Sequence, residues 1–285
     1  MRTTFRLRNW LFAAPALLLA SLSWSQPLPA GKPQIKSASV LVMDESDATV
    51  LYSKQSQKVM PVASITKLMT ALVVLDGKQP LDEVVTILPA DRDRTKASAS
   101  RLAVGTKLTR AELLHLALMS SENRAAQAVG RAYPGGLNTF IKAMNAKARE
   151  LGMKSSRFVD PTGLSSGNVA TAADLAKLVI ASSHQPLIEK YSTSEQLTVK
   201  VGRQMLEFRN TNSLTSKEDW EISVQKTGFT QDAGQCLVMR ATIQDRPTVI
   251  VLLNSFGKLT RVADARRIRR WMEGGAGTQM ARAGK

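Results

Sequence analysis

The sequence predicts an α/β protein in which one antiparallel sheet is covered by helices. Strand-like apolar runs stand near both ends of the chain, at 38–43 and 49–52 and again between 220 and 253, while helical spacing dominates the middle. A two-stranded hairpin cannot bury both of its faces, so the early and late strands are expected to share one sheet. Residues 261–272 are predicted to form one closing, basic helix.

The first 25 residues have the pattern of a secretory signal peptide. Three arginines precede a short apolar run at 11–22, and Ser23 and Ser25 occupy the small-residue positions of a cleavage site. The apolar run is shorter than the about 20 residues that a membrane-spanning helix requires. We therefore expect residues 1–25 to be removed on export to the periplasm, with 26–36 as a flexible leader. The alternative is the amphipathic amino-terminal helix of a cytosolic protein.

Helical spacing of apolar residues recurs between the two strand regions. The predicted helices cover 64–76, 109–119, 124–132, 137–151 and 171–181. Thr171 is the expected cap of the last of these helices. Two strand-like runs, 197–201 and 205–208, follow it, and the glycine-rich segment 274–285 is interpreted as a flexible tail.

Composition narrows the classes of function. The only cysteine, Cys236, excludes an intramolecular disulfide, and with two histidines it argues against a zinc site. The net charge of +16 favours an anionic partner. Nucleic acid is the least favoured, because the chain has an export pattern and only 5% aromatic residues. Weak contact with anionic membrane or wall polymer fits better, and charge that serves solubility alone is the alternative.

Ser64 and Lys67 form the first candidate catalytic pair. Residues three apart on a helix share a face, so the Ser64 hydroxyl and the Lys67 amine are expected to meet at the helix start. A serine needs a base to become a nucleophile, and a lysine serves when burial and neighbouring cations lower its pKa. His115 lies among leucines and His184 precedes Gln185-Pro186, so neither stands in a recognisable catalytic pattern.

The Ser-x-x-Lys spacing is weak evidence by itself. It occurs again at 223–226, where a strand would turn the two side chains to opposite faces, and at 255–258, in an expected turn. An ordinary helix surface is the alternative interpretation of the pair at 64–67.

Ser121 and Asn123 form a second candidate group. From a short loop, both side chains can point into a cleft, where the hydroxyl would relay a proton and the amide would bind a substrate amide. A helix cap is the alternative, and the same spacing recurs at 166–168.

A third group, Lys226-Thr227-Gly228, follows a predicted strand. The cation and the hydroxyl suit a substrate carboxylate, and the glycine lets a substrate backbone approach the strand closely. An ordinary strand end is the alternative.

Ser-x-x-Lys, Ser-x-Asn and Lys-Thr-Gly, in this order, form the motif set of penicillin-binding proteins and class A β-lactamases. The segments 61–70 and 158–164 look like those of the low-molecular-mass D-alanyl-D-alanine peptidases, and the resemblance covers roughly 36–272. It implies a β-lactamase/transpeptidase-like fold, an antiparallel sheet flanked by helices with an all-helical lobe, and a D,D-peptidase domain at 37–273.

The resemblance also implies roles for the motif residues. Ser64 corresponds to the acylated nucleophile and Lys67 to its base, and Ser121 belongs to the catalytic set. The residues that correspond to the substrate-binding set are Asn123, Lys226, Thr227 and Gly228. The backbone N–H groups of Ser64 and Phe229 would form the oxyanion hole. No cofactor and no metal are implied.

Two features narrow the choice within this family. The Glu-x-x-Leu-Asn segment of class A β-lactamases is missing, which argues against a β-lactamase, so β-lactam antibiotics are expected to act as covalent inhibitors that stay attached. The chain after Lys226 is expected to form two strands and one helix, without the extra β-rich domain of many carboxypeptidases. The short architecture resembles the D-alanyl-D-alanine endopeptidases of the penicillin-binding protein seven type. These enzymes cut the D-alanyl–diaminopimelate cross-links of peptidoglycan, a reaction that contributes to cell wall biogenesis and cell shape.

Three alternatives remain at this point. A D,D-carboxypeptidase that removes the terminal D-alanine of pentapeptide stems would use the same residues. A non-catalytic cell-wall-binding protein could keep the same fold. The basic helix, with Arg261 and Arg270 near its ends, would either touch anionic lipid or pack on the sheet with a solvated basic face.

Overall fold

A computed structural model describes residues 31–93 and 100–283 of the chain, and the side chains up to 274. The expected signal peptide, 1–25, and the first part of the expected leader lie outside the described residues.

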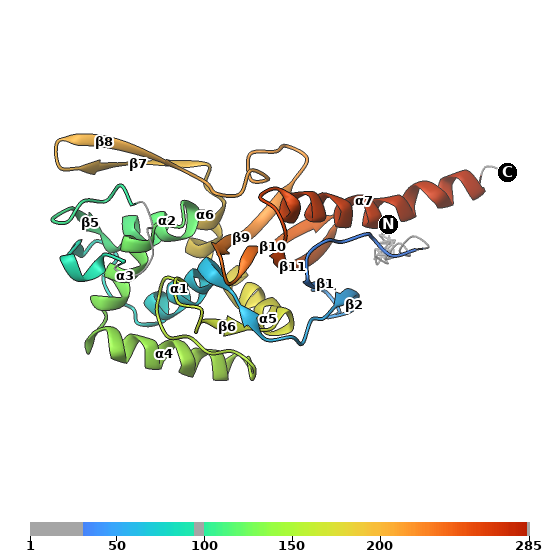
Figure 1. Ribbon diagram of the computed structural model, residues 1–285. Coiled ribbons are helices and arrows are strands. Elements are labelled where there is room, and N and C mark those ends of the chain that lie inside the picture. Colours follow the sequence, from blue (N-terminus) through green and yellow to red (C-terminus); the bar gives the residue numbers. More distant parts are fainter. Residues whose placement is uncertain (1–30, 94–99, 284–285) are drawn as a thin grey trace, which may run out of the picture.

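A five-stranded antiparallel sheet with the order β2-β1-β11-β10-β9 forms the centre of the fold (Figure 1). Its strands are β1 (Ser39–Asp44), β2 (Val50–Lys54), β9 (Glu221–Thr230), β10 (Gly234–Ile243) and β11 (Arg246–Ser255). The register of β1 on β11 runs from Ser39 opposite Leu253 to Asp44 opposite Thr248. This pairing confirms that the early and late strands share one sheet, and it leaves β9 at an edge.

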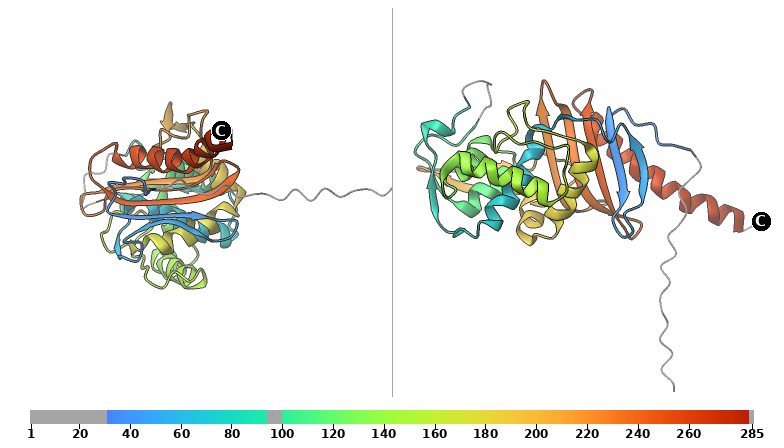
Figure 2. Two further views of the ribbon diagram at one scale, coloured as in Figure 1. Left: turned by 90° about the vertical axis from the view of Figure 1, so that its right-hand side faces the viewer. Right: turned by 90° about the horizontal axis from the view of Figure 1, so that it is seen from below.

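Helices cover both faces of the sheet, as the sequence predicted. The helix α5 (Ala172–Ser183) packs on one face and α7 (Thr260–Ala283) on the other, and the left view of Figure 2 shows the sheet between them. Val238 and Val251 face the α5 side, whereas Leu237 and Ile250 face α7. This alternation is the period of two that a pleated strand imposes on its side chains.

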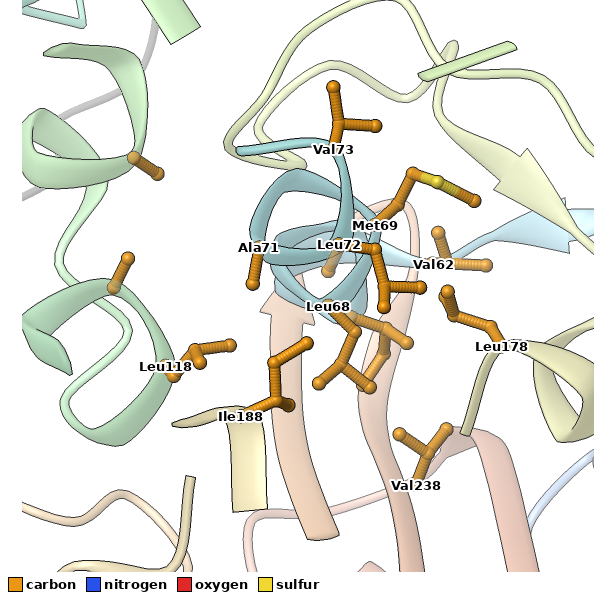
Figure 3. Close-up of a cluster of buried hydrophobic side chains, with 14 of the residues drawn as sticks. Val62, Leu68, Met69, Ala71, Leu72, Val73, Leu118, Leu178, Ile188 and Val238 are labelled. Carbon is orange, nitrogen blue, oxygen red and sulfur yellow. The ribbon is translucent and has the colours of Figure 1, made fainter. Parts of the chain in front are cut away.

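A helical lobe lies beside the sheet. It consists of α1 (Thr66–Asp76), α2 (Arg110–Met119), α3 (Asn123–Arg131), α4 (Gly136–Glu150) and α6 (Pro186–Thr193). Helix α1 is apolar on nearly all sides, which is the pattern of a helix buried in a core. Figure 3 shows Leu68 and Leu72 of α1 among Leu118 of α2, Ile188 of α6 and Val238 of β10, so α1 joins the lobe to the sheet.

The lobe contains more than helices. The short strands β4 (Val84–Thr86) and β5 (Lys107–Thr109) pair beside it, and β3 (Met60–Pro61) pairs with β6 (Val169–Ala170). The predicted strands β7 (Gln196–Val201) and β8 (Gln204–Arg209) form a hairpin of their own, which extends over the lobe in Figure 1. Strands of two or three residues are too short to show a period in the sequence, so they were not predicted.

Both ends of the described chain differ from the sequence-based interpretation. Helix α7 continues to Ala283 and includes most of the expected tail, because glycine weakens a helix by about 1 kcal/mol without breaking it as proline does. The end of the expected leader is held in place: Lys36 N donates to Asp264, and Lys54 Nζ donates to Ile35 O. Among the described residues, no helix has both the length and the apolar character needed to cross a membrane.

Candidate active site

Ser64 lies in a tight turn between a strand and a helix. A 3₁₀ turn, η1 (Ala63–Ile65), precedes α1, and Ala63 has a φ of 48°, a left-handed conformation that is uncommon for a residue other than glycine. The helix therefore begins at Thr66, two residues after the predicted start. The Ser64 side chain, in the middle of this turn, is half-buried.

Two glycines allow other segments to approach the turn that carries Ser64. Gly163 has a φ of +84°, and a Cβ there would lie 1.9 Å from the Ala63 carbonyl oxygen. A Cβ at Gly228 of β9 would lie 3.0 Å from Val62 O and 3.2 Å from Ser64 N. The Ser64 backbone is thus enclosed between the loop before α5 and the free edge of β9.

Lys67 lies one turn after Ser64, with its amine buried. Its Nζ lies 2.8 Å from Ser64 Oγ, 2.7 Å from Asn123 Oδ1 and 2.7 Å from Thr162 O. Burial lowers the pKa of this amine to about 7, against the opposing effect of the Asp160 and Glu122 carboxylates. The sequence predicted that burial and neighbouring cations would lower this pKa together, and burial is the cause that lowers it.

The three neighbours of Lys67 determine where its lone pair points when the amine is neutral. A neutral amine has two N–H groups and one lone pair, and both Thr162 O and Asn123 Oδ1 can only accept a hydrogen bond. The Ser64 hydroxyl is the one of the three that can donate. Neutral Lys67 therefore accepts the hydroxyl hydrogen of Ser64, which is the contact that a general base requires.

Asp160 organises the loop that supplies Thr162 O. One of its carboxylate oxygens accepts from Thr162 N, Thr162 Oγ1 and Gly163 N, and the other accepts from Ser165 N and Asn168 Nδ2. Asn168 is buried in this network, so the second Ser-x-Asn spacing at 166–168 is structural. The sequence indicated only a turn here.

The structure places the two residues of the Ser-x-Asn motif differently. Asn123 begins α3 and contacts Lys67, while Glu122 accepts a hydrogen bond from Arg124 N as the cap of that helix. Ser121 is half-buried with a φ of 61°, and within the described part of the chain its hydroxyl does not join the hydrogen bonds around Lys67.

Lys226, Thr227 and Gly228 lie on β9, the strand whose free edge faces Ser64. The Lys226 amine is buried and donates to Thr227 O at 3.1 Å. Burial, with the charges of Lys67 and Arg261, lowers its pKa well below the usual range. Phe229 follows on the same edge with 57% of its surface exposed.

Two residues beside this strand were not identified from the sequence as parts of the site. Arg261, in the first turn of α7, donates from NH1 to Gly228 O at 2.9 Å, so it does not belong to a solvated basic face. Thr211 Oγ1 lies 2.6 Å from Thr227 Oγ1, and Thr211 N donates to Met119 O at the end of α2. No motif marks either residue, because both contacts join segments that are distant in sequence.

Two hollows adjoin this arrangement. The larger, about 710 Å³, is lined by Asn123, Gln127, Thr162 and Asp232 among others, and we call it the Asp232 hollow. The other, about 500 Å³, lies between the hairpin and the turn before α3, and we call it the hairpin hollow. Its lining residues are Arg101, Ser120, Glu122, Glu207, Phe208 and Arg209. Within the described ranges, no group of three or more His, Cys, Asp or Glu side chains is arranged to hold a metal ion.

Comparisons with known proteins identify relatives over most of the chain. A family model described as D-alanyl-D-alanine carboxypeptidase matches residues 26–257. A D-alanyl-D-alanine endopeptidase of Pseudomonas aeruginosa is 48% identical, covering 98% of this chain and 93% of that protein. One of Escherichia coli is 46% identical, covering 93% and 86%. The crystal structure of a Streptomyces K15 DD-transpeptidase has a TM-score of 0.79 at 28% identity, covering 86% of this chain and 99% of that one.

Proposed function

Because the chain belongs to the D-alanyl-D-alanine carboxypeptidase family of serine peptidases, we propose that it cleaves the D-alanyl–diaminopimelate cross-links of peptidoglycan as a D,D-endopeptidase. The observation that carries the proposal is the 2.8 Å contact between Lys67 Nζ and Ser64 Oγ, with an amine whose pKa is about 7. The two relatives above 45% identity, both named endopeptidases, support this choice of reaction.

The proposed reaction has two steps. In the first, Lys67 takes the Ser64 proton as Ser64 Oγ attacks the D-alanine carbonyl, and the proton passes to the leaving amine as the amide C–N bond breaks. In the second, water hydrolyses the resulting ester and restores the Ser64 hydroxyl. The Ser64 and Phe229 N–H groups are proposed to hold the carbonyl oxygen, where charge develops during each step. For Ser121 we propose the proton relay, which requires its hydroxyl to turn toward Lys67.

The strand β9 is proposed to bind the substrate along its free edge. An extended peptide gains backbone hydrogen bonds by adding to a sheet edge, and Gly228 leaves room for that approach. Thr227, with Lys226 and Arg261 behind it, is proposed to hold the carboxylate of the residue that leaves. β-Lactam antibiotics would occupy the same place and acylate Ser64.

We propose that the protein acts in the periplasm. The support is the signal-peptide pattern of residues 1–25 and an insoluble wall substrate that lies outside the cytoplasm. Peptidoglycan stems are the proposed partner, and anionic lipid or wall polymer is a weaker one.

Digestion of purified wall fragments tests the proposal directly. Incubated with cross-linked peptide dimers, the protein is expected to release monomers, and Ser64→Ala to release none. Parallel incubation with free pentapeptide stems separates the two family reactions, because a carboxypeptidase releases D-alanine from these stems and leaves the dimers intact. If the dimers persist under conditions where the pentapeptides lose D-alanine, the protein is a carboxypeptidase and the proposed endopeptidase activity is wrong.

The carboxypeptidase is the second candidate because the family model carries that description, as does a Streptomyces relative at 32% identity. A non-catalytic wall-binding protein is disfavoured by the close Ser64–Lys67 contact, since binding alone does not require a buried amine at a hydroxyl.

Replacing Thr211 by valine is expected to lower kcat/KM for carboxylate-terminated stems roughly threefold to tenfold, mostly through KM. The valine keeps the shape but removes the hydroxyl that contacts Thr227, and such a hydrogen bond contributes about 0.5–1.5 kcal/mol. Steady-state kinetics on pentapeptide stems measures the effect. Thr211→Ser should recover most of the loss, and equal impairment of both variants would mean that Thr211 acts through packing.

A further inference from the structure

The hairpin hollow has no role in the reaction described so far. One wall is the end of β8 at the base of the β7–β8 hairpin, and the other is the turn that carries Ser121. Ser120 of the hollow precedes Ser121, and Arg209 stands two residues before Thr211. Since Thr211 contacts Thr227, the hollow lies next to the place proposed for the carboxylate of the leaving residue.

The two hollows adjoin different parts of the proposed substrate-binding edge. Asp232, which lines the larger hollow, follows the carboxyl end of β9. Arg209, which lines the hairpin hollow, stands two residues before Thr211, and Thr211 contacts Thr227 of β9. A carboxypeptidase releases a single residue that ends at its carboxylate, so it has no substrate beyond Thr227. A cross-linked substrate continues past this carboxylate into a second peptide stem, which needs space on that side.

The charge of the hairpin hollow indicates which chemical group it binds. The Arg101 guanidinium lies 4.0 Å from the ring centroid of Phe208, a residue that is 2% exposed, so the cation rests on a fixed aromatic surface. Within the described residues, Arg101 forms no salt bridge, while Arg209 pairs with Glu207 at 2.7 Å. The Glu122 carboxylate accepts from Ser100 Oγ and Arg124 N. Arg101 is therefore a held cation that is available to an incoming carboxylate.

We propose that the hairpin hollow binds the peptide stem that leaves on cleavage, with Arg101 holding a carboxylate of that stem. The inference rests on the proposed endopeptidase function and assigns the part of the site that distinguishes a cross-linked substrate from a pentapeptide. The β7–β8 hairpin supplies Phe208 as the support for Arg101, and the turn before α3 supplies the opposite wall.

The test compares two substrates on the full-length mature protein. Arg101→Ala is expected to lower the ratio of kcat/KM for cross-linked dimers over kcat/KM for pentapeptide stems by about tenfold or more. Arg101→Lys should give an intermediate ratio, because lysine keeps the charge but loses the planar contact with Phe208. Arg203→Ala, at the exposed hairpin turn, is the matched control and should keep the wild-type ratio.

A binding measurement separates the hollow from the chemistry. Titration of the free tetrapeptide stem into Ser64→Ala protein should give a dissociation constant that rises about tenfold when Arg101→Ala is added, with circular dichroism reporting the fold. An unchanged ratio together with an unchanged dissociation constant would overturn the hollow's role. The wild-type dimer assay alone decides the endopeptidase function, so the two failures are distinguishable.

Discussion

Lys67→Ala is expected to slow acylation of Ser64 by about 10²–10⁴-fold, the range that a positioned general base contributes. The neutral amine accepts the Ser64 proton, and no other side chain takes that position in the contacts of Ser64 that the described structure shows. The measurement is the rate at which labelled penicillin adds one acyl group to the protein. Ser64→Ala lacks the hydroxyl that is acylated, so it should take up no label and serves as the negative control.

The same assignment fixes the pH dependence of acylation. Below pH 7 the Lys67 amine carries a third proton and has no lone pair, whereas above it the neutral form dominates. The wild-type rate should therefore rise with pH through about 7 and then level off. Lys67→Ala should lose this inflection, and Lys142→Ala, an exposed lysine on α4, should keep both the rate and the inflection. A rate that falls or stays flat as pH rises through 7 would remove Lys67 from the role of base.

Much of the fold was predictable because it depends on local periodicity. The apolar runs in β10 and β11 predicted both strands, and the Thr171 cap is confirmed by the hydrogen bond that Thr171 Oγ1 accepts from Asp174 N at 3.0 Å. The short paired strands and α6 lack enough residues for a period to show. Helix α7 extends past its predicted end because glycine is only a weak signal for where a helix stops.

The candidate site was predictable only where a motif gave the spacing. Ser64, Lys67 and Asn123 come from the motifs, and the structure brings these three into contact. The third contact of the Lys67 amine is the Thr162 carbonyl, a backbone group, so no residue type in the sequence indicates it. Arg261 reaches Gly228 from a helix that begins after the last strand, a contact set by tertiary packing alone.

Gly163→Ala is expected to have the second large effect, on both stability and acylation. At a φ of +84°, any Cβ is strained, and here it would also lie 1.9 Å from Ala63 O and 2.8 Å from Ser64 N. Strain and overpacking together should lower the free energy of unfolding by about 2–5 kcal/mol. Relief of the clash requires the loop to withdraw from the turn that carries Ser64, and a shift of about 1 Å in a reacting group can cost on the order of 10²-fold in rate.

Gly105→Ala separates conformational strain from the collision with the turn that carries Ser64. Gly105 has a φ of +88°, but a Cβ there would meet no atom within 4 Å. The control should therefore lose only the about 1–2 kcal/mol of the left-handed conformation and keep the acylation rate. Urea unfolding gives the free energies, and labelled penicillin gives the rates. If the two alanine variants lost equal stability and acylated at equal rates, then Gly163 would matter for its backbone conformation alone, and the loop would not hold Ser64 in place.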